Sequence, residues 1–247
     1  MSAVVHTPDA PPAATDPMRG TARLAGVLYL LTFVSIPTLV LYQPFKGHAD
    51  FVLGSGSATG LMWGALSEIV VAVAGIGTAV VLFPVLKGQS ETAALGLVTA
   101  RVVESSLIVV GVVSVLTAVT LRNDPTGTDP ASLVTAGHAL VAVYNWTFLL
   151  SQSLMPVFCD LLLGYVLYRS GLVPRILPMI AFVGAPLLLA SDLAVFFGAY
   201  AQLSLPAALA ALPVALFEFS LGIWLLVKGF NPSSPLLARP AVAGLPS

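Results

Sequence analysis

Seven ionisable side chains lie inside long apolar stretches and are the residues of this chain best suited to chemistry: Glu68, Arg101, Glu104, His138, Asp160, Asp192 and Glu218. Arg101 and Glu104 are three residues apart, so they lie on one face of a helix and can pair. A charge at the centre of a membrane costs roughly 2.5 to 3.5 kcal/mol, which makes a series of unpaired charges expensive. We therefore expect these side chains to face the interior of a helical bundle.

The stretches that carry them have the composition of membrane-spanning helices. Hydrophobic residues make up 57% of the chain and charged residues only 9%, far below the roughly 25% charged content of soluble domains. One crossing takes about 20 apolar residues. Six stretches qualify, at about 24–42, 59–86, 92–121, 133–168, 176–200 and 205–227. This pattern predicts an all-α fold, an integral membrane bundle of six transmembrane helices.

The fourth stretch, 133–168, is longer than one perpendicular crossing requires. It is therefore strongly tilted, kinked at Pro156, or begins as a turn outside the membrane. The six stretches together form one domain, 23–229. Residues 1–22 are a Pro/Ala-rich segment and residues 230–247 a Pro-rich segment, and both are expected to be disordered tails.

The basic residues near the ends of the spans predict the orientation of the chain. Lys and Arg collect on the cytoplasmic side of membrane proteins. With a cytoplasmic N-terminus, seven basic residues fall on that side and two on the other: Arg19, Arg23, Lys87, Arg169, Arg175, Lys228 and Arg239 against Lys46 and Arg122. Both termini, including the 1–22 tail, are therefore expected in the cytoplasm.

Depth in the membrane then limits which ionisable groups can meet. In this orientation Arg101 and Asp160 belong to the inner half, and Glu104 and Glu218 lie near the midplane. Arg101 is the only cation at that depth, so we expect one polar cluster of Arg101, Glu104, Asp160 and Glu218. Glu68 and Asp192 belong to the outer half, where His138 is the one possible cationic partner.

The fourth span also carries a polar stripe. His138, Asn145 and Gln152 follow at steps of seven residues, which drift by about 20° per step, and Asp160 returns to within about 80° of Gln152. A stripe of this kind faces other protein or water, because lipid would leave its donors and acceptors unsatisfied. Hydrogen bonding between helices and a permeation path both remain open as its role.

Several other classes of function are disfavoured. The net charge of -1, without a Lys/Arg-rich run, argues against binding to nucleic acid. The lone Cys159 cannot form an internal disulfide, and no His/Cys/Asp/Glu set has a metal-ligand spacing. The serines have no histidine or lysine at a recognisable nucleophile spacing. The sequence thus favours a protein without metal, cofactor or enzymatic activity.

Four segments carry a resemblance to a known family: YRSGLVPRIL at 168–177, EFSLGIWLLVKG at 218–229, RLAGVLYLL at 23–31 and RVVE at 101–104. They resemble the DUF4386 family of bacterial membrane proteins over about 23–229. The family usually has a Gly-Asp-Ala segment and a Phe-Arg-x-Gly entry to its second helix, where this chain has HAD at 48–50 and LMWG at 61–64. The resemblance implies the six-span topology and a bacterial cytoplasmic membrane, and it supplies no catalytic residues.

Two hypotheses for the function follow from these observations. In the first, the Arg101 cluster binds a small polar or anionic solute, or relays protons, within a carrier embedded in the lipid bilayer. In the second, the chain is a membrane scaffold or accessory subunit, and the cluster only locks the packing of the helices. The sequence predicts neither an oligomeric state nor a protein partner.

Overall fold

Six helices of this chain are long and apolar enough to cross a membrane: Met18–Leu41, Thr59–Leu86, Glu91–Asn123, Pro130–Ser170, Ile176–Phe196 and Leu205–Val227. They are seen in a computed structural model, which describes residues 17–48, 50–54, 57–124, 127 and 129–237. Within these ranges the chain forms no β-strand. The expected all-α bundle of six membrane-spanning helices is confirmed.

The first span is built from three pieces, α1 (Pro17–Leu31), a 3-10 turn η1 (Thr32–Ser35) and α2 (Thr38–Leu41). The short helix α3 (Gln43–Gly47) and the 3-10 turn η2 (Phe51–Leu53) lead to α4 (Thr59–Leu86) and α5 (Glu91–Asn123). The fourth span joins α6 (Pro130–Phe148), a π-helical turn η3 (Leu149–Leu154) and α7 (Met155–Ser170). The last two spans are α8 (Ile176–Phe196) and α9 (Leu205–Val227).

Local signals in the sequence explain where these helices begin and end. The Ser90 hydroxyl accepts a hydrogen bond from the Ala93 N–H and caps α5. Asp129 accepts two backbone N–H bonds at the start of α6, where Pro130 occupies the first helical position. Gly171 ends α7 with a φ of 65°, a left-handed conformation that glycine adopts without steric cost.

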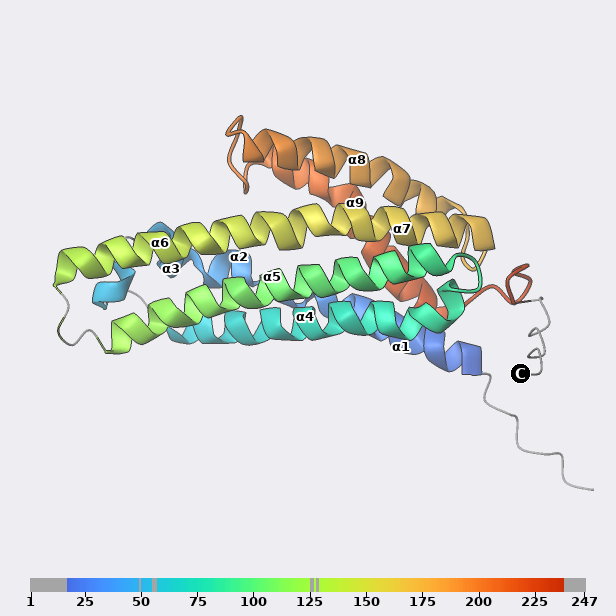
Figure 1. The fold of residues 1–247 in the computed structure, drawn as a ribbon, viewed down its shortest axis with the longest axis horizontal. Coiled ribbons are helices and arrows are strands. Elements are labelled where there is room, and N and C mark those ends of the chain that lie inside the picture. Colours follow the sequence, from blue (N-terminus) through green and yellow to red (C-terminus); the bar gives the residue numbers. More distant parts are fainter. Residues whose placement is uncertain (1–16, 49, 55–56, 125–126, 128, 238–247) are drawn as a thin grey trace, which may run out of the picture.

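The fourth span stays continuous through Pro156 because of η3. Proline has no N–H, so it removes one hydrogen bond of a regular helix. The π turn ends at Leu154, two residues before Pro156, and the Met155 N–H is bonded to the Leu150 carbonyl five residues back. The 41 residues of this span exceed the length of one crossing. The N-terminal end of α6 and the C-terminal end of α5 both extend beyond the α8–α9 pair (Figure 1).

The spans close into a ring. Each span packs on the next along the chain, with α4 on α1, α5 on α4, α7 on α5, α8 on α7 and α9 on α8, and α9 returns to pack on α1. Gly26 and Gly222 permit this last contact, since a Cβ atom on Gly26 would lie 2.7 Å from the Gly222 carbonyl oxygen. Helices α5 and α9 therefore lie across the ring from each other.

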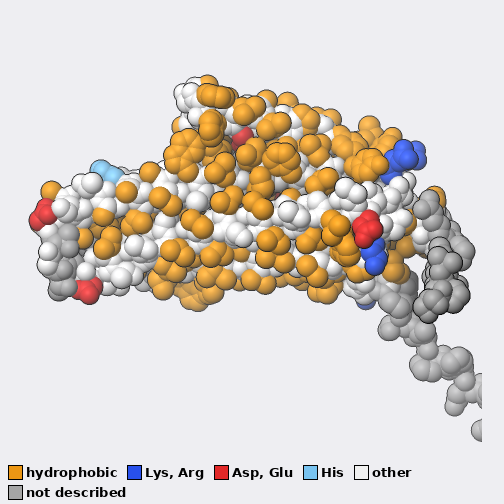
Figure 2. Space-filling view, viewed as in Figure 1, with side chains coloured by type: hydrophobic (Ala, Val, Ile, Leu, Met, Phe, Trp, Pro, Cys, Tyr) orange, Lys and Arg blue, Asp and Glu red, His pale blue; other side chains and the backbone are white. Residues whose placement is uncertain are grey.

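Both described ends of the chain lie at one end of the bundle, which we call the terminal end; the end with the α5–α6 connection is the far end (Figure 1). Hydrophobic side chains cover the middle of the visible face, and basic side chains gather near the terminal end (Figure 2). Large apolar side chains are exposed on every span, among them Val73 and Leu205. Such a surface suits contact with lipid.

Three boundaries differ from the sequence-based expectation. Residues 17–22, expected in the N-terminal tail, belong to α1. Residues 230–237, expected in the disordered C-terminal tail, fold back on the α7–α8 turn, where the Ser234 hydroxyl donates to the Ser170 carbonyl at 2.6 Å and Phe230 is buried. Between the expected spans 24–42 and 59–86 the structure has α3 and η2, whose Phe45 and Phe51 are buried. The rest of both tails, 1–16 and 238–247, lies outside the described residues.

Candidate functional site

Arg101 lies at the centre of the ring and joins two helices. Its Nη1 donates to both carboxylate oxygens of Glu104, at 3.1 and 2.9 Å, one turn further along α5. Its Nη2 donates to Glu218 Oε1 of α9 at 2.7 Å. The arginine is 2% exposed and the Glu218 side chain 12%. The sequence-based expectation that these three residues share one depth therefore corresponds to a buried network of two ion pairs.

Other helices complete the wall around Arg101. The guanidinium carbon lies 5.7 Å from the centre of the Tyr29 ring on α1, within the range of a cation–π contact. Gly75 of α4 faces the Arg101 side chain, and on the same side the Ser105 hydroxyl donates to the Ala72 carbonyl at 2.8 Å. Four of the six spans, α1, α4, α5 and α9, thus supply a residue within or beside this cluster.

Asp160 of α7 lies next to the network without joining it. It interacts electrostatically with Glu218, Arg101 and Glu104, but it forms no ion pair with Arg101. The residue is fully buried, and both carboxyl oxygens lack a hydrogen-bond partner within the described part of the chain. Its neighbour Cys159 lies with its thiol 3.8 Å from Glu104 Oε2. The predicted fourth member of the cluster is therefore close to the other three but unbonded.

The charges of this cluster do not balance. One guanidinium faces three carboxyl groups, so full ionisation leaves two negative charges in excess. An unpaired charge inside a low-dielectric interior is far more costly than a neutral group. The cluster must therefore take up protons or a cation, and Asp160 has free oxygen atoms to receive one.

A second polar cluster surrounds Glu68 on α4. Its carboxylate accepts hydrogen bonds from the hydroxyls of Tyr42 at 3.1 Å and Tyr144 at 2.8 Å, and from Gln152 Nε2 at 3.0 Å. Glu68 is fully buried. Seven residues separate it from Gly75 beside Arg101, a rise of about 10 Å along α4. The two clusters therefore lie about two helical turns apart.

The cation nearest to Glu68 in this arrangement is Lys46 of α3. Its ammonium nitrogen lies 5.3 Å from the centre of the Tyr144 ring and 5.8 Å from that of Phe148, and it interacts electrostatically with Glu68. Partial burial lowers the pKa of Lys46 below the usual lysine value, and the charge of Glu68 opposes this shift. We expected His138 to be the partner here. Within the described residues His138 forms neither a hydrogen bond nor an ion pair with Glu68 or Asp192, because it is exposed at the far end.

The π turn η3 directs two neighbouring side chains to different helices. Gln152 donates to Glu68 on α4, whereas the Ser153 hydroxyl donates to Asp192 Oδ1 on α8 at 2.6 Å. The other Asp192 oxygen and the Asn145 side-chain oxygen are buried without a described partner. The predicted stripe of the fourth span thus divides, with Gln152 and Asp160 at the two clusters and His138 at the surface.

Sequence reasoning missed Tyr42, Tyr144 and Lys46 as neighbours of Glu68. Tyr144 lies eight residues before Gln152, within about 80° of it on a regular helix, so it belonged to the polar stripe by position. Because most of its side chain is an apolar ring, Tyr144 was not counted among the polar residues of the stripe. Tyr42 and Lys46 gave no such signal, because the turn that brings them to α4 follows an irregular end of the first span.

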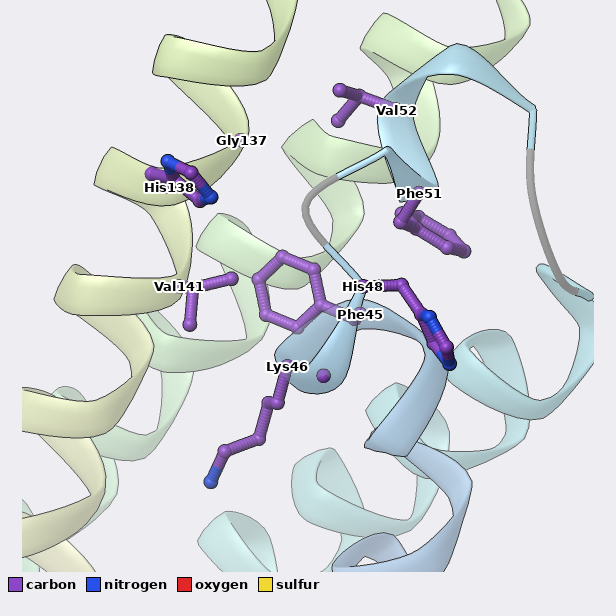
Figure 3. A pocket seen from close by; sticks show the side chains of 9 residues that line it. Phe45, Lys46, His48, Phe51, Val52, Gly137, His138 and Val141 are labelled. Atoms are coloured by element: carbon purple, nitrogen blue, oxygen red, sulfur yellow. The ribbon is translucent and has the colours of Figure 1, made fainter.

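A cavity opens at the far end between α3, η2 and α6 (Figure 3). It has a volume of about 190 Å³, and Lys46, His48 and His138 are its basic lining residues. Within the described ranges, no group of three or more His, Cys, Asp or Glu side chains is arranged to hold a metal ion.

The fold and the two buried clusters define a multi-pass membrane protein with ionisable groups in its interior. The chain belongs to the family described as "Domain of unknown function (DUF4386)", whose model matches residues 24–229. This confirms the family expected from the sequence motifs. Comparisons with curated proteins and with solved structures give no match.

Proposed function

We propose that this chain is a membrane carrier in which the Arg101 cluster binds protons together with a small polar or anionic solute. The observation that carries the proposal is the fully buried Asp160, whose two oxygen atoms lack a described partner beside two ion pairs. A buried acid that is not used for packing is the group expected to bind and release a proton during transport.

The position of the second cluster supports the same function. Glu68 lies about two turns of α4 from Arg101, and Ser105 and Ala72 occupy the interval. Three hydrogen-bond donors hold the Glu68 carboxylate in place. A proton passing between the two ends of the bundle therefore meets an acid in each half.

Flux measurements in liposomes test the carrier function. A pH-sensitive dye inside the vesicles reports proton movement while a panel of small carboxylates, amines and neutral solutes is offered outside. We expect Asp160→Asn to abolish solute-dependent proton flux while the variant keeps its thermal unfolding temperature. Glu91→Gln is the matched control, since Glu91 is an exposed acid at the start of α5. Undiminished flux in Asp160→Asn would contradict the proposal.

A scaffold function is the second candidate, and the Arg101–Glu218 pair favours it, because it holds together two helices that are not neighbours in the ring. Buried polar pairs can fix the register of helices. The same liposomes discriminate the two functions. A scaffold shows no flux above that of empty vesicles with any of the solutes, whereas a carrier does.

We further infer that both termini face the cytoplasm of a bacterial cell. Six basic residues of the described chain support this orientation, since they lie near the terminal end: Arg19, Arg23, Lys87, Arg169, Arg175 and Lys228. A reporter fused after residue 247 that is active only in the cytoplasm tests the orientation. Activity of a reporter restricted to the outer side would contradict it.

A further inference from the structure

The cavity at the far end lies outside the Arg101 cluster and borders the Glu68 cluster through Lys46. It is lined by residues of α3 and η2, by His48 between them, and by Gly137, His138 and Val141 of α6. In Figure 3, Lys46 extends from α3 toward α6, and the Phe45 ring lies between α3 and the side chains of His138 and Val141. Its volume of about 190 Å³ lies below the 300 to 1,000 Å³ of pockets for drug-sized ligands, so it suits a small molecule.

The lining combines basic side chains with apolar walls. Lys46, His48 and His138 are the basic lining residues, although the His48 side chain points away from α6 in Figure 3, and the lining residues include no carboxylate. Phe45, Val52 and Val141 form the apolar walls. An inorganic anion would use the basic groups alone, whereas an organic anion uses both parts of the surface.

Lys46 is a partly buried cation that interacts with Glu68 without a direct ion pair. It forms no hydrogen bond or ion pair within the described part of the chain, and its ammonium group lies over the rings of Tyr144 and Phe148. Glu68 already accepts hydrogen bonds from the hydroxyls of Tyr42 and Tyr144 and from Gln152, and it forms no ion pair with Lys46. A negatively charged group in the cavity would therefore complete the environment of Lys46.

We propose that this cavity binds a small organic monoanion, a carboxylate with a short aromatic or aliphatic body, and that Lys46 is its charge partner. The carboxylate lies toward Lys46, and the body packs against Phe45, Val52 and Val141. The exposed imidazole of His138 borders the entrance. This site does not depend on carrier activity, because binding at the far end can be measured in the absence of flux.

Binding of benzoate to the full chain in a neutral detergent tests the site, with thermal unfolding and calorimetry as readouts. Benzamide has the same shape without the charge, and butyrate replaces the aromatic body. We expect benzoate and butyrate, but not benzamide, to raise the unfolding temperature. Lys46→Met should weaken benzoate binding about tenfold or more, as expected for loss of a charge-assisted contact.

Matched variants separate the site from general effects of charge or folding. Lys87→Met should bind benzoate like the wild type, because Lys87 lies over the Phe83 ring at 5.8 Å in a similar cation–π contact outside the cavity. Lys46→Arg should keep binding. Val141→Phe fills the apolar part and should lose binding without the loss of any charge, which tests the cavity even where Lys46→Met fails to fold.

Four results would overturn the proposal: no binding of benzoate or butyrate to the wild type, equal binding of benzamide, unchanged binding in Lys46→Met, or equal loss in Lys87→Met. Competition with an anionic lipid is a further part of the experiment. If phosphatidylglycerol in the micelles displaces benzoate while phosphatidylcholine does not, and inorganic phosphate competes equally, the site recognises a phosphate headgroup instead of a carboxylate.

Discussion

Arg101 on α5 and Glu218 on α9 are joined by an ion pair of 2.7 Å across the interior of the ring. The two residues are 117 positions apart in the chain. Removal of one partner from a buried ion pair leaves an uncompensated charge, which costs about 3 to 5 kcal/mol. The pair therefore couples the charge state of the Arg101 cluster to the folding stability of the helical bundle.

A double-mutant cycle measures this link. We expect Arg101→Gln to lower the free energy of unfolding by about 3 to 5 kcal/mol, Glu218→Gln to lower it by less because Glu104 still pairs with Arg101, and the double variant to lose less than the sum. The measurement is denaturant or thermal unfolding in detergent micelles. Arg175→Gln, an exposed change at the terminal end, serves as the control. Additive losses would show that the two charges do not interact.

The hydroxyl of Tyr144 is expected to matter through Glu68. Tyr144→Phe removes one of three donors to a buried carboxylate and should cost about 1 to 3 kcal/mol of stability. Tyr165→Phe on the same span should be neutral within about 0.5 kcal/mol, because the exposed Tyr165 has no described hydrogen bond. Equal unfolding temperatures for the two variants would disprove the role of the hydrogen bond.

Closure of the ring depends on the small size of Gly26. A methyl group there would lie 2.6 Å from the backbone nitrogen of Leu226, so Gly26→Ala should force α1 and α9 apart and cost about 1 to 3 kcal/mol. Gly20→Ala on the same helix meets nothing within 4 Å and should be neutral or slightly stabilising. Thermal unfolding of both variants checks this, and a stable Gly26→Ala variant would argue against the close contact.

The lowered pKa of Lys46 predicts a distinct pH dependence. Burial disfavours its charged form, so the folded protein releases this proton at a lower pH than the unfolded chain. The associated loss of stability is therefore fully present at low pH and is relieved as the pH rises from the folded pKa toward the ordinary lysine value. Glu68 opposes the shift, and Glu68→Gln should lower the pKa of Lys46 further.

Labelling with an amine-specific reagent followed by mass spectrometry checks this prediction, because only the neutral amine reacts. Lys46 should reach half of its maximal labelling rate below the pH at which a free lysine does, and Glu68→Gln should move that midpoint downward. An unchanged midpoint in Glu68→Gln would show that the charge of Glu68 does not affect the pKa of Lys46.

Much of this architecture could be predicted from the sequence, because span length and helical spacing follow directly from the order of the residues. Six apolar runs are long enough to cross a membrane, so the span count followed from length and composition alone. The Arg101–Glu104 pair followed from helical spacing, and depth brought Glu218 to the same level.

The rotation of each helix about its own axis could not be predicted from the sequence. Asp160 was expected in one polar cluster with Arg101, and it lies beside the ion-pair network without a hydrogen bond, since its angular position depends on how α7 packs against its neighbours. The π turn at Leu149–Leu154 was equally hidden, because it changes the register of side chains without changing their hydrophobicity. His138 was assigned to an acid that two tyrosines and Gln152 satisfy.

The closed ring also sets an order of biogenesis. At a synthesis rate of roughly 5 to 20 residues per second, Arg101 waits roughly 6 to 23 seconds for Glu218 to emerge, given the 117 residues between them. Glu104, one turn away, is available from the moment α5 forms and can accompany the arginine into the bilayer. The hydrogen bonds from Arg101 to Glu104 thus neutralise the arginine within α5 until Glu218 is inserted with the last helix. Docking of α9 on α1 then completes assembly.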